Sequence, residues 1–166
     1  TDIWHIENGD ITISAGESGN NVTQNNNTTY GDTNTIITNQ NKDTASSHTV
    51  TIETNDKNDK VEVTLKDVNI EATGGKAAVS VTGSGNTTIE LDGDNKLSGS
   101  GAHAALEHNQ TVDSERNVTS GKLTIQDENN DGSLNATGKG FAAGIGGGSV
   151  KAGQVTITGG TITATG

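Results

Sequence analysis

The sequence predicts an all-β fold made of short strands, and two observations lead to this prediction. Apolar residues alternate with polar ones, as in TVTIET (residues 49–54) and VEVTL (residues 61–65), which is the period of a β-strand. These segments are too short for helices and are separated by turns rich in Gly, Asn and Asp. Short strands divided by turns therefore account for most of the readable chain.

The composition sets a second constraint, because only 28% of the 166 residues are hydrophobic. A fraction this low is typical of disordered chains. The regular alternation of Val, Ile, Leu and Thr argues against disorder, since repeated strands that stack on one another can bury a narrow core. One domain is the expectation for this length.

A unit of strand-like segments recurs between residues 60 and 166. Equivalent positions return at intervals of roughly 25–35 residues, which is within the range of stacked-repeat proteins. The third segment of the unit, at residues 77–79, 104–106 and 142–144, is missing after the last repeat. The apolar pairs of the first segment are Val63/Leu65, Ile89/Leu91, Leu123/Ile125 and Val155/Ile157, and those of the second are Ile70/Ala72, Leu97/Gly99, Leu134/Ala136 and Ile162/Ala164.

Three short strands per repeat favour a single-stranded right-handed parallel β-helix, a solenoid with three short strands per coil. Parallel strands would then stack coil on coil, with Ile, Leu, Val and Ala forming inward ladders. The right hand follows from the usual handedness of parallel crossovers. A β-sandwich is the competing fold, but a sandwich gives no reason for the second segment of the unit to recur four times with the same apolar pattern.

The expected domain has two parts. Residues 1–48 are predicted to form an N-terminal cap, which includes Trp4, and an Asn-rich excursion in which only Thr35–Thr38 is strand-like. Residues 49–166 are predicted to form the coils, with residues 109–120 as a loop inserted at a corner. Because the last repeat is incomplete, we expect a fragment of a larger surface protein and a monomer within a multidomain chain.

The repeat resembles a known group of bacterial proteins. The motifs GKLTI, GSLNATG, AAGIGGG and GQVTITGGTITATG, all within residues 121–166, are similar to modules of large Firmicutes surface proteins. Those modules resemble carbohydrate-binding β-helix domains, some related in fold to calcium-dependent pectate lyases. The resemblance is good over residues 122–166 and fair over residues 60–108. It implies an extracellular, non-catalytic, calcium-containing module at the surface of a Gram-positive bacterium, which binds sugar or acts as an adhesin.

An acidic turn provides the candidate metal site. Residues 127–132, DENNDG, contain D-x-N-x-D-G, in which alternate oxygen side chains can surround one hard cation such as Ca²⁺. Gly138 occupies the position of the bidentate Glu, which excludes a full EF-hand. Stacked turns would bring further carboxylates close together, and these repel unless a cation relieves them. A solvated acidic turn is the alternative. The candidate ligands are Asp127, Asn129, Asp131, Asp92, Asp94 and Asp67.

Aromatic and outward-facing polar residues are the candidates for contact with a polysaccharide or a host or cell-surface glycan. Tyr30 is the best-placed exposed aromatic, within the Asn-rich segment. Phe141 is either a second exposed aromatic or, as the preferred interpretation, a cover over the last core layer. Outward rows of threonine and other polar residues could also hold a glycan. The candidate ligand-binding residues are Tyr30, Glu71, Glu90, Asn135 and Phe141.

The charge and the motifs narrow the function further. A net charge of −11 makes nucleic acid and anionic membrane surfaces poor partners, and no apolar run is long enough for membrane insertion. No catalytic motif is present. We therefore expect a non-catalytic carbohydrate-binding or adhesin module stabilised by calcium. The alternatives are a structural stalk or spacer, and a polysaccharide lyase, active or degenerate, that would use Lys66, Lys96 or Lys122 near the acidic turns.

Overall fold

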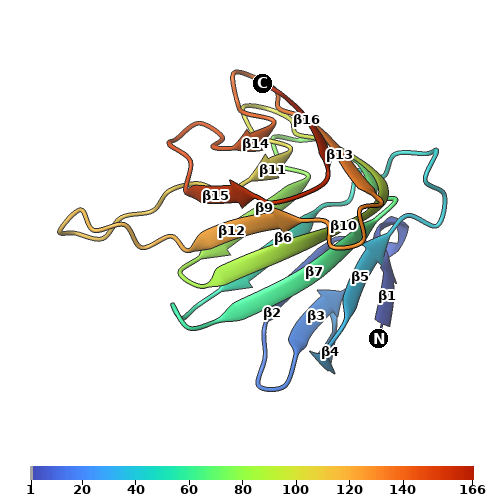
Figure 1. Cartoon of the computed structure of the whole chain (residues 1–166), viewed down its shortest axis with the longest axis horizontal. Helices are drawn as coiled ribbons and strands as arrows, with labels where there is room; N and C mark the ends of the chain where they lie inside the picture. Colours follow the sequence, from blue (N-terminus) through green and yellow to red (C-terminus); the bar gives the residue numbers. More distant parts are fainter. Residues whose placement is uncertain (1) are drawn as a thin grey trace.

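Strands from distant parts of the sequence pair side by side in two sheets, of which the first has nine strands (Figure 1). The structure, a computed structural model, describes residues 2–166. The strand order is β1-β5-β7-β10-β12-β15, with β8 and β13 also beside β10, and β16 beside β13. The bounds are β1 Asp2–His5, β5 Thr35–Thr38, β7 Lys60–Lys66, β8 Asn69–Glu71, β10 Asn86–Ser98, β12 Lys122–Gln126, β13 Gly132–Thr137, β15 Gln154–Ile157 and β16 Thr161–Thr165.

The second sheet has seven strands in the order β14-β11-β9-β6-β2-β3-β4. A single short 3₁₀ helix, η1 (Ile6–Asn8), connects β1 to β2 within the described residues. The bounds are β2 Ile11–Ala15, β3 Asn20–Gln24, β4 Asn27–Asp32, β6 Val50–Thr54, β9 Val79–Gly83, β11 Leu106–Glu107 and β14 Ile145–Gly146.

The all-β class is confirmed, because 52% of the residues lie in strands and 2% in helix. The more detailed prediction, a single-stranded right-handed parallel β-helix with three short strands per coil, is wrong. The chain forms two sheets, and the second mixes parallel strands with the antiparallel pairs β2–β3 and β3–β4.

Two local features explain this difference. The predicted turn at residues 92–94 does not separate two strands, because β10 continues through it for 13 residues. Gly93, with φ of 62°, allows the strand to bend there without a side chain that would clash. Residues 20–32, which the sequence suggests are loop, instead form β3 and β4. Asn25 and Asn26 adopt positive φ of 55° and 63° between them, as asparagine tolerates in a tight hairpin.

The repeated segments do pair in parallel, but their register differs from the sequence alignment. Ile89 lies beside Val63 on one side, as the alignment predicts. On the other side it lies beside Ile125, and Leu123 lies beside Thr87. A shift of two residues keeps each side chain on the same face of its strand, so the alternating pattern is satisfied by either register.

The acidic turn between β12 and β13 is an insertion relative to β10. Glu90 pairs with Gln126, and Gly93 pairs with Gly132. The five residues 127–131 therefore lie opposite only two residues of β10, and they must loop out of the sheet. The two-residue shift is already present before this insertion, where Thr87 pairs with Leu123, and it persists after it, where Leu97 pairs with Ala136.

Residues 109–120 form an arm that extends away from the body, in yellow at the left of Figure 1. Val112 and Val118 form an antiparallel bridge within it, and both side chains are exposed. His108 lies buried at its base, with Nδ1 3.0 Å from the Val81 carbonyl oxygen and Nε2 2.8 Å from that of Gly121. The predicted inserted loop is thus a bridged arm whose base is held against β9.

The inward apolar residues form one core cluster that joins both sheets. The four core residues predicted from the best-preserved repeat, Leu123, Ile125, Leu134 and Ala136, are at most 1% exposed. Trp4 is only half-buried beside this core, and its indole Nε1 donates a hydrogen bond to Asp32 at 3.0 Å. Val22, on the unpredicted strand β3, is fully buried.

One buried amide links three strands at the centre of the first sheet. The side chain of Asn95 is 2% exposed, and its Oδ1 accepts a hydrogen bond from the Val68 amide at 2.9 Å. Its Nδ2 donates to the carbonyl oxygens of Leu65, Asp92 and Ser133. Asn95 therefore satisfies backbone groups where the regular ladder is interrupted.

We expect the Asn95→Leu variant to be destabilised by about 1–3 kcal/mol, because buried backbone groups lose their partners without access to water. Urea unfolding followed by circular dichroism measures the change. Asn135→Leu makes the same substitution at an exposed position on β13 and is expected to change stability by no more than about 0.5 kcal/mol. Equal effects of the two substitutions would contradict this role for Asn95.

Candidate functional site

The inserted loop brings three carboxylates together at the end of β12. Asp92 lies on β10, and Asp127 and Asp131 lie at the two ends of the loop that faces it. The Asp127 side chain is 8% exposed and closes its own turn, because its Oδ1 accepts from the Asp131 amide at 3.2 Å and its Oδ2 from the Gly132 amide at 2.9 Å. Asp127 thus has both oxygens engaged by backbone donors.

The carboxylates of this cluster disturb one another. Partial removal from water raises the pKa of Asp131 above its ordinary value, and the Asp92 carboxylate, through its charge and a hydrogen bond, and the charge of Asp127 raise it further. Within the described chain, Asp92 Oδ1 is buried without a hydrogen-bond partner. The corner therefore holds uncompensated negative charge, which favours binding of a proton or a cation.

Of the other predicted metal ligands, Asp94 lines one hollow with Asp127 and Asp131, whereas Asp67 and Asn129 do not line it. Asp67 Oδ1 accepts a hydrogen bond from the Asp94 amide at 3.0 Å, and Asp94 Oδ1 accepts one from Ser133 Oγ at 2.8 Å. Asn129 lies along one groove on the face of the sheet, together with Asp92. The six predicted ligands therefore do not surround one point, and no group of three or more His, Asp or Glu side chains in residues 2–166 has the arrangement of a metal site.

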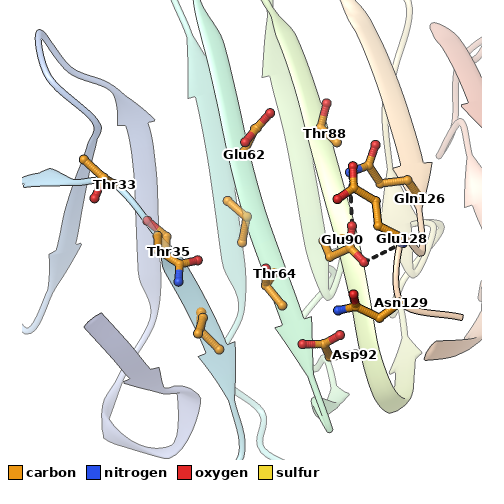
Figure 2. Close-up of a pocket in the computed structure, with 13 residues that line it drawn as sticks. Thr33, Thr35, Glu62, Thr64, Thr88, Glu90, Asp92, Gln126, Glu128 and Asn129 are labelled. Carbon is orange, nitrogen blue, oxygen red and sulfur yellow. Dashed lines mark hydrogen bonds between the residues drawn. The ribbon is translucent and has the colours of Figure 1, made fainter. Parts of the chain in front are cut away.

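A polar groove of roughly 350 Å³ crosses the outer face of the first sheet (Figure 2). Its floor crosses β5, β7, β10 and β12, and the loops at residues 33–34 and 128–129 stand at its two ends. In-register pairing aligns the row Ile36, Thr64, Glu90 and Gln126 across the floor. The lining residues are Thr33, Asn34, Thr35, Ile36, Glu62, Val63, Thr64, Thr88, Glu90, Asp92, Gln126, Glu128 and Asn129.

Glu90 is the predicted ligand residue that lies in this groove. Its Oε1 accepts a hydrogen bond from Gln126 Nε2 at 3.0 Å, and its Oε2 accepts one from the Glu128 amide at 2.9 Å. Figure 2 shows both contacts at the end of the groove near Asn129. Glu90 thereby holds the loop that forms this end, while Glu62 and Thr64 on β7 face the groove beside it.

The remaining predicted ligand residues are dispersed over other surfaces. Tyr30 is 75% exposed on β4, which confirms its exposure but places it outside the groove lining. Glu71 on β8 and Asn135 on β13 are exposed on the branch of the first sheet formed by β8, β13 and β16. The five predicted residues therefore do not form one site.

Phe141 does not cover the core, contrary to the preferred sequence interpretation. Its side chain is fully exposed and its φ is +70°, a left-handed conformation that is unusual for an aromatic residue. The preceding residue, Gly140, packs against Ala102 of the previous repeat, which has a φ of +67°. The stacking of these left-handed turns presents Phe141 to solvent at a corner.

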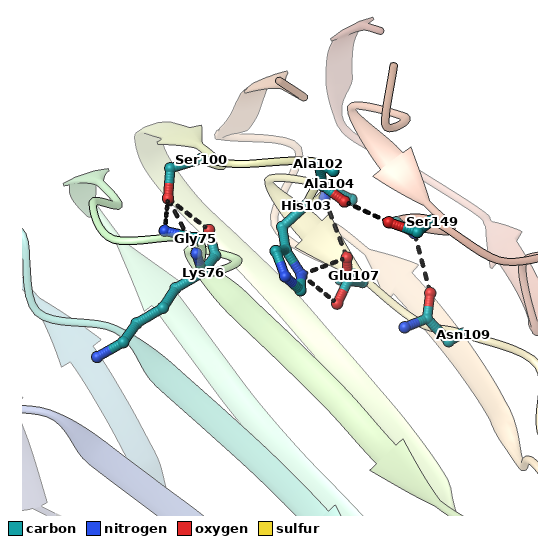
Figure 3. Close-up of polar contacts among 10 residues, drawn as sticks. Gly75, Lys76, Ser100, Ala102, His103, Ala104, Glu107, Asn109 and Ser149 are labelled. Atoms are coloured by element: carbon teal, nitrogen blue, oxygen red, sulfur yellow. Dashed lines mark hydrogen bonds and ion pairs between the residues drawn. The ribbon is translucent and has the colours of Figure 1, made fainter. Parts of the chain in front are cut away.

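The neighbouring polar cluster is held by a buried carboxylate (Figure 3). The Glu107 side chain is 7% exposed, lies 3.1 Å from His103 Nδ1, and accepts a hydrogen bond from the Ala104 amide. In the adjacent turn, Ser100 Oγ accepts from the Gly75 and Lys76 amides. These contacts hold the turns that precede β9 and β11, so their role is structural.

Sequence reasoning missed Glu62, Thr88, Gln126 and Glu128 as residues of one groove. The alignment placed Glu90 beside Thr124, whereas the structure pairs Glu90 with Gln126 and Thr88 with Thr124. The DENND insertion gave no signal of this, because the shift of two residues lies before it and leaves the alternating pattern unchanged. With the correct register, the polar residues Thr64, Glu90 and Gln126 fall in one row across the sheet.

Comparison of the chain with protein-family models, with curated proteins and with solved structures finds no match. Among residues 2–166, no helix has the length and apolar character needed to cross a membrane.

We expect Asp131→Asn to raise the melting temperature at neutral pH in calcium-free buffer, because it removes a charge that the folded state disfavours. The pKa of Asp131 is raised on folding, so its contribution to stability is fully present below the ordinary value of 3.8 and is lost as the pH rises through the folded-state pKa. The advantage of the variant should therefore vanish in acid. Thermal unfolding across the pH range measures this, with Asp43→Asn, at an exposed position outside the corner, as the equal-charge control. A pH-independent advantage of Asp131→Asn would contradict the prediction.

Proposed function

We propose that this chain is a non-catalytic extracellular module that binds a neutral, hydroxyl-rich polymer such as a glycan in the groove across β5, β7, β10 and β12. The observation that carries the proposal is the chemistry of the lining. Threonine hydroxyls, Gln and Asn amides and carboxylates converge on one elongated surface with walls at both ends. Hydroxyl groups of a sugar can donate to the carboxylates and exchange hydrogen bonds with the amides.

The electrostatics of the groove support a neutral ligand over an anionic one. Its lining contains Glu62, Glu90, Asp92 and Glu128 but neither lysine nor arginine. The whole chain carries a net charge of −11, which adds to the repulsion of uronates, phosphates and nucleic acids. A polysaccharide lyase acting on uronates would need a basic residue beside its substrate, so the lining favours binding over elimination.

The groove predicts selective binding that depends on its carboxylates. We expect retention on a neutral polysaccharide such as cellulose, xylan or mannan, and none on polygalacturonate. Glu62→Gln should weaken the affinity for the retained polysaccharide by about tenfold, because a charge-assisted hydrogen bond is replaced by a weaker one. Pull-down on insoluble polysaccharides, followed by calorimetry with soluble oligosaccharides, measures the effect.

Glu71→Gln is the matched control, since it makes the same charge change on β8, outside the groove. Glu90→Gln tests the loop that closes one end of the groove, because it weakens the hydrogen bond that the Glu90 carboxylate accepts from the Glu128 amide. Equal losses in Glu62→Gln and Glu71→Gln would indicate a general charge effect and contradict the proposed site. Retention only on polygalacturonate, or on no polysaccharide tested, would contradict the proposed function.

We further propose that the acidic corner binds one Ca²⁺ ion, with Asp92 and Asp131 as the residues that would hold it. The unpartnered Asp92 oxygen and the raised pKa of Asp131 support this proposal. Asp127 would contribute its charge, since its oxygens already accept backbone hydrogen bonds. A bound cation would offset the mutual repulsion and so stabilise the fold.

Calcium is therefore expected to raise the melting temperature relative to EDTA, and Asp92→Asn and Asp131→Asn should each abolish most of the increase. Asp67→Asn is the control, because Asp67 accepts a hydrogen bond from the Asp94 amide and does not line the hollow that holds Asp127 and Asp131. Scanning calorimetry with and without CaCl₂ gives the result. An unchanged melting temperature in the wild-type chain would rule out the calcium site while leaving the groove to be judged by its own experiment.

A further inference from the structure

A second polar hollow, of roughly 380 Å³, lies on the outer face of the second sheet near the starts of β2, β6, β9 and β11. It shares no lining residue with the groove of Figure 2. Because the inward side chains of the two sheets form one core, the hollow and the groove open on different faces of the molecule. The polar residues that define the hollow are Thr12, Thr51, Ser80, Lys76, His103 and Glu107.

In-register pairing aligns three hydroxyl groups along the floor of this hollow. Thr12 lies beside Thr51, and Thr51 lies beside Ser80. All three side chains are half-buried, and none of their hydroxyl groups makes a hydrogen bond among the described residues. Neighbouring hydroxyls are one strand apart, about 4.8 Å. The row is therefore free both to donate to a ligand and to accept from it.

The same row ends at Glu107, which lies beside Ser80. The Glu107 carboxylate lies 3.1 Å from Nδ1 of His103 and accepts a hydrogen bond from the Ala104 amide. Besides holding the turn, this contact fixes the imidazole ring. The other ring nitrogen, Nε2 of His103, has no hydrogen-bond partner within residues 2–166 and so is available to a ligand.

The charges of the hollow nearly cancel. Each of its two carboxylates has a histidine partner, since Asp10 lies 3.3 Å from His48 Nδ1 and Glu107 lies beside His103. Lys76 makes no ion pair in the part of the chain that the structure describes, and Figure 3 shows its side chain extending away from the turn. The hollow thus holds a single negative charge when both imidazoles are neutral and a single positive charge when both are protonated. Neither a polyanion nor a polycation is favoured there.

We propose that this hollow is a second binding site, for a neutral, hydroxyl-rich ligand such as a glycan. The hydroxyl row exchanges hydrogen bonds with the hydroxyls of the ligand, Lys76 donates to them, and Nε2 of His103 donates or accepts according to its tautomer. Because the two sites share no residue, binding in the hollow does not require binding in the groove.

The hollow is the weaker of the two sites. Its carboxylates are engaged by histidines, so it lacks a free charged acceptor such as Glu62 in the groove. A chain with binding sites on two faces can link two polymer molecules, which raises its retention on a polysaccharide above that of either site alone.

A ¹H–¹⁵N NMR titration of the 166-residue chain with cellohexaose, xylohexaose and mannohexaose tests this site directly. The expected result, with at least one of these neutral oligosaccharides, is a set of saturable amide shifts in residues 10–12, 49–51, 76–80 and 103–107. These shifts should saturate at a higher concentration than those of the groove. They should also persist unchanged in Glu62→Gln, in which only the shifts of the groove weaken.

Two substitutions test the roles of individual groups. Thr51→Val removes the central hydroxyl and should raise the dissociation constant of the hollow by about fivefold, the effect of one neutral hydrogen bond. Thr124→Val is the matched control, on a strand face outside both sites. Lys76→Met should weaken the same step, while Lys139→Met, at an exposed position elsewhere, should leave it unchanged.

The titration separates this site from the groove. Saturable shifts in the groove alone would overturn the second site and leave the groove in place. Shifts in the hollow alone would support the second site and place glycan binding outside the groove. Loss of both sets of shifts in Glu62→Gln, equal effects of Thr51→Val and Thr124→Val, or no shift in the hollow with any of the three oligosaccharides would overturn the second site.

Discussion

In-register parallel pairing of the repeats is the constraint on which the rest of this structure depends. Each inward position of one strand lies beside the corresponding position of the next, so Val63, Ile89 and Ile125 form a continuous buried row. A polar residue in such a row loses its contact with water, so leaving its polar groups without partners among the neighbouring strands costs free energy. Asn95 finds its partners through four bonds, and this is possible because the backbone around it departs from the regular ladder.

The same register organises the outer face. Once the inward residues are matched, the outward residues of successive strands are also aligned, because side chains alternate with a period of two. Thr64, Glu90 and Gln126 become neighbours in this way, although they are far apart in the sequence. The inserted loop at residues 127–131 forms one end of the groove through Glu128 and Asn129 and supplies Asp127 and Asp131 to the carboxylate cluster. The candidate groove and the candidate cation site are therefore two consequences of one insertion.

Much of this could be predicted from the sequence. Alternation identified the principal strands after residue 49 and the core residues Leu123, Ile125, Leu134 and Ala136, and the DENNDG turn identified carboxylates that do meet, Asp127 and Asp131. The hairpin of β3 and β4 could not be predicted, because its exposed residues are polar and its pattern is that of a loop. The exposure of Phe141 also depends on stacking, since Gly140 rests on the preceding turn.

The sequence by itself determined which residues face inward, because the period of two assigns each side chain to a face whatever its partner strand. Only the tertiary structure decided which repeat positions lie side by side. A shift of two residues leaves the alternating pattern intact, so hydrophobicity cannot distinguish Leu123 from Ile125 as the neighbour of Ile89. The choice depends on which residues of β10 and β12 meet across the sheet, and those contacts exist only when the strands are packed together.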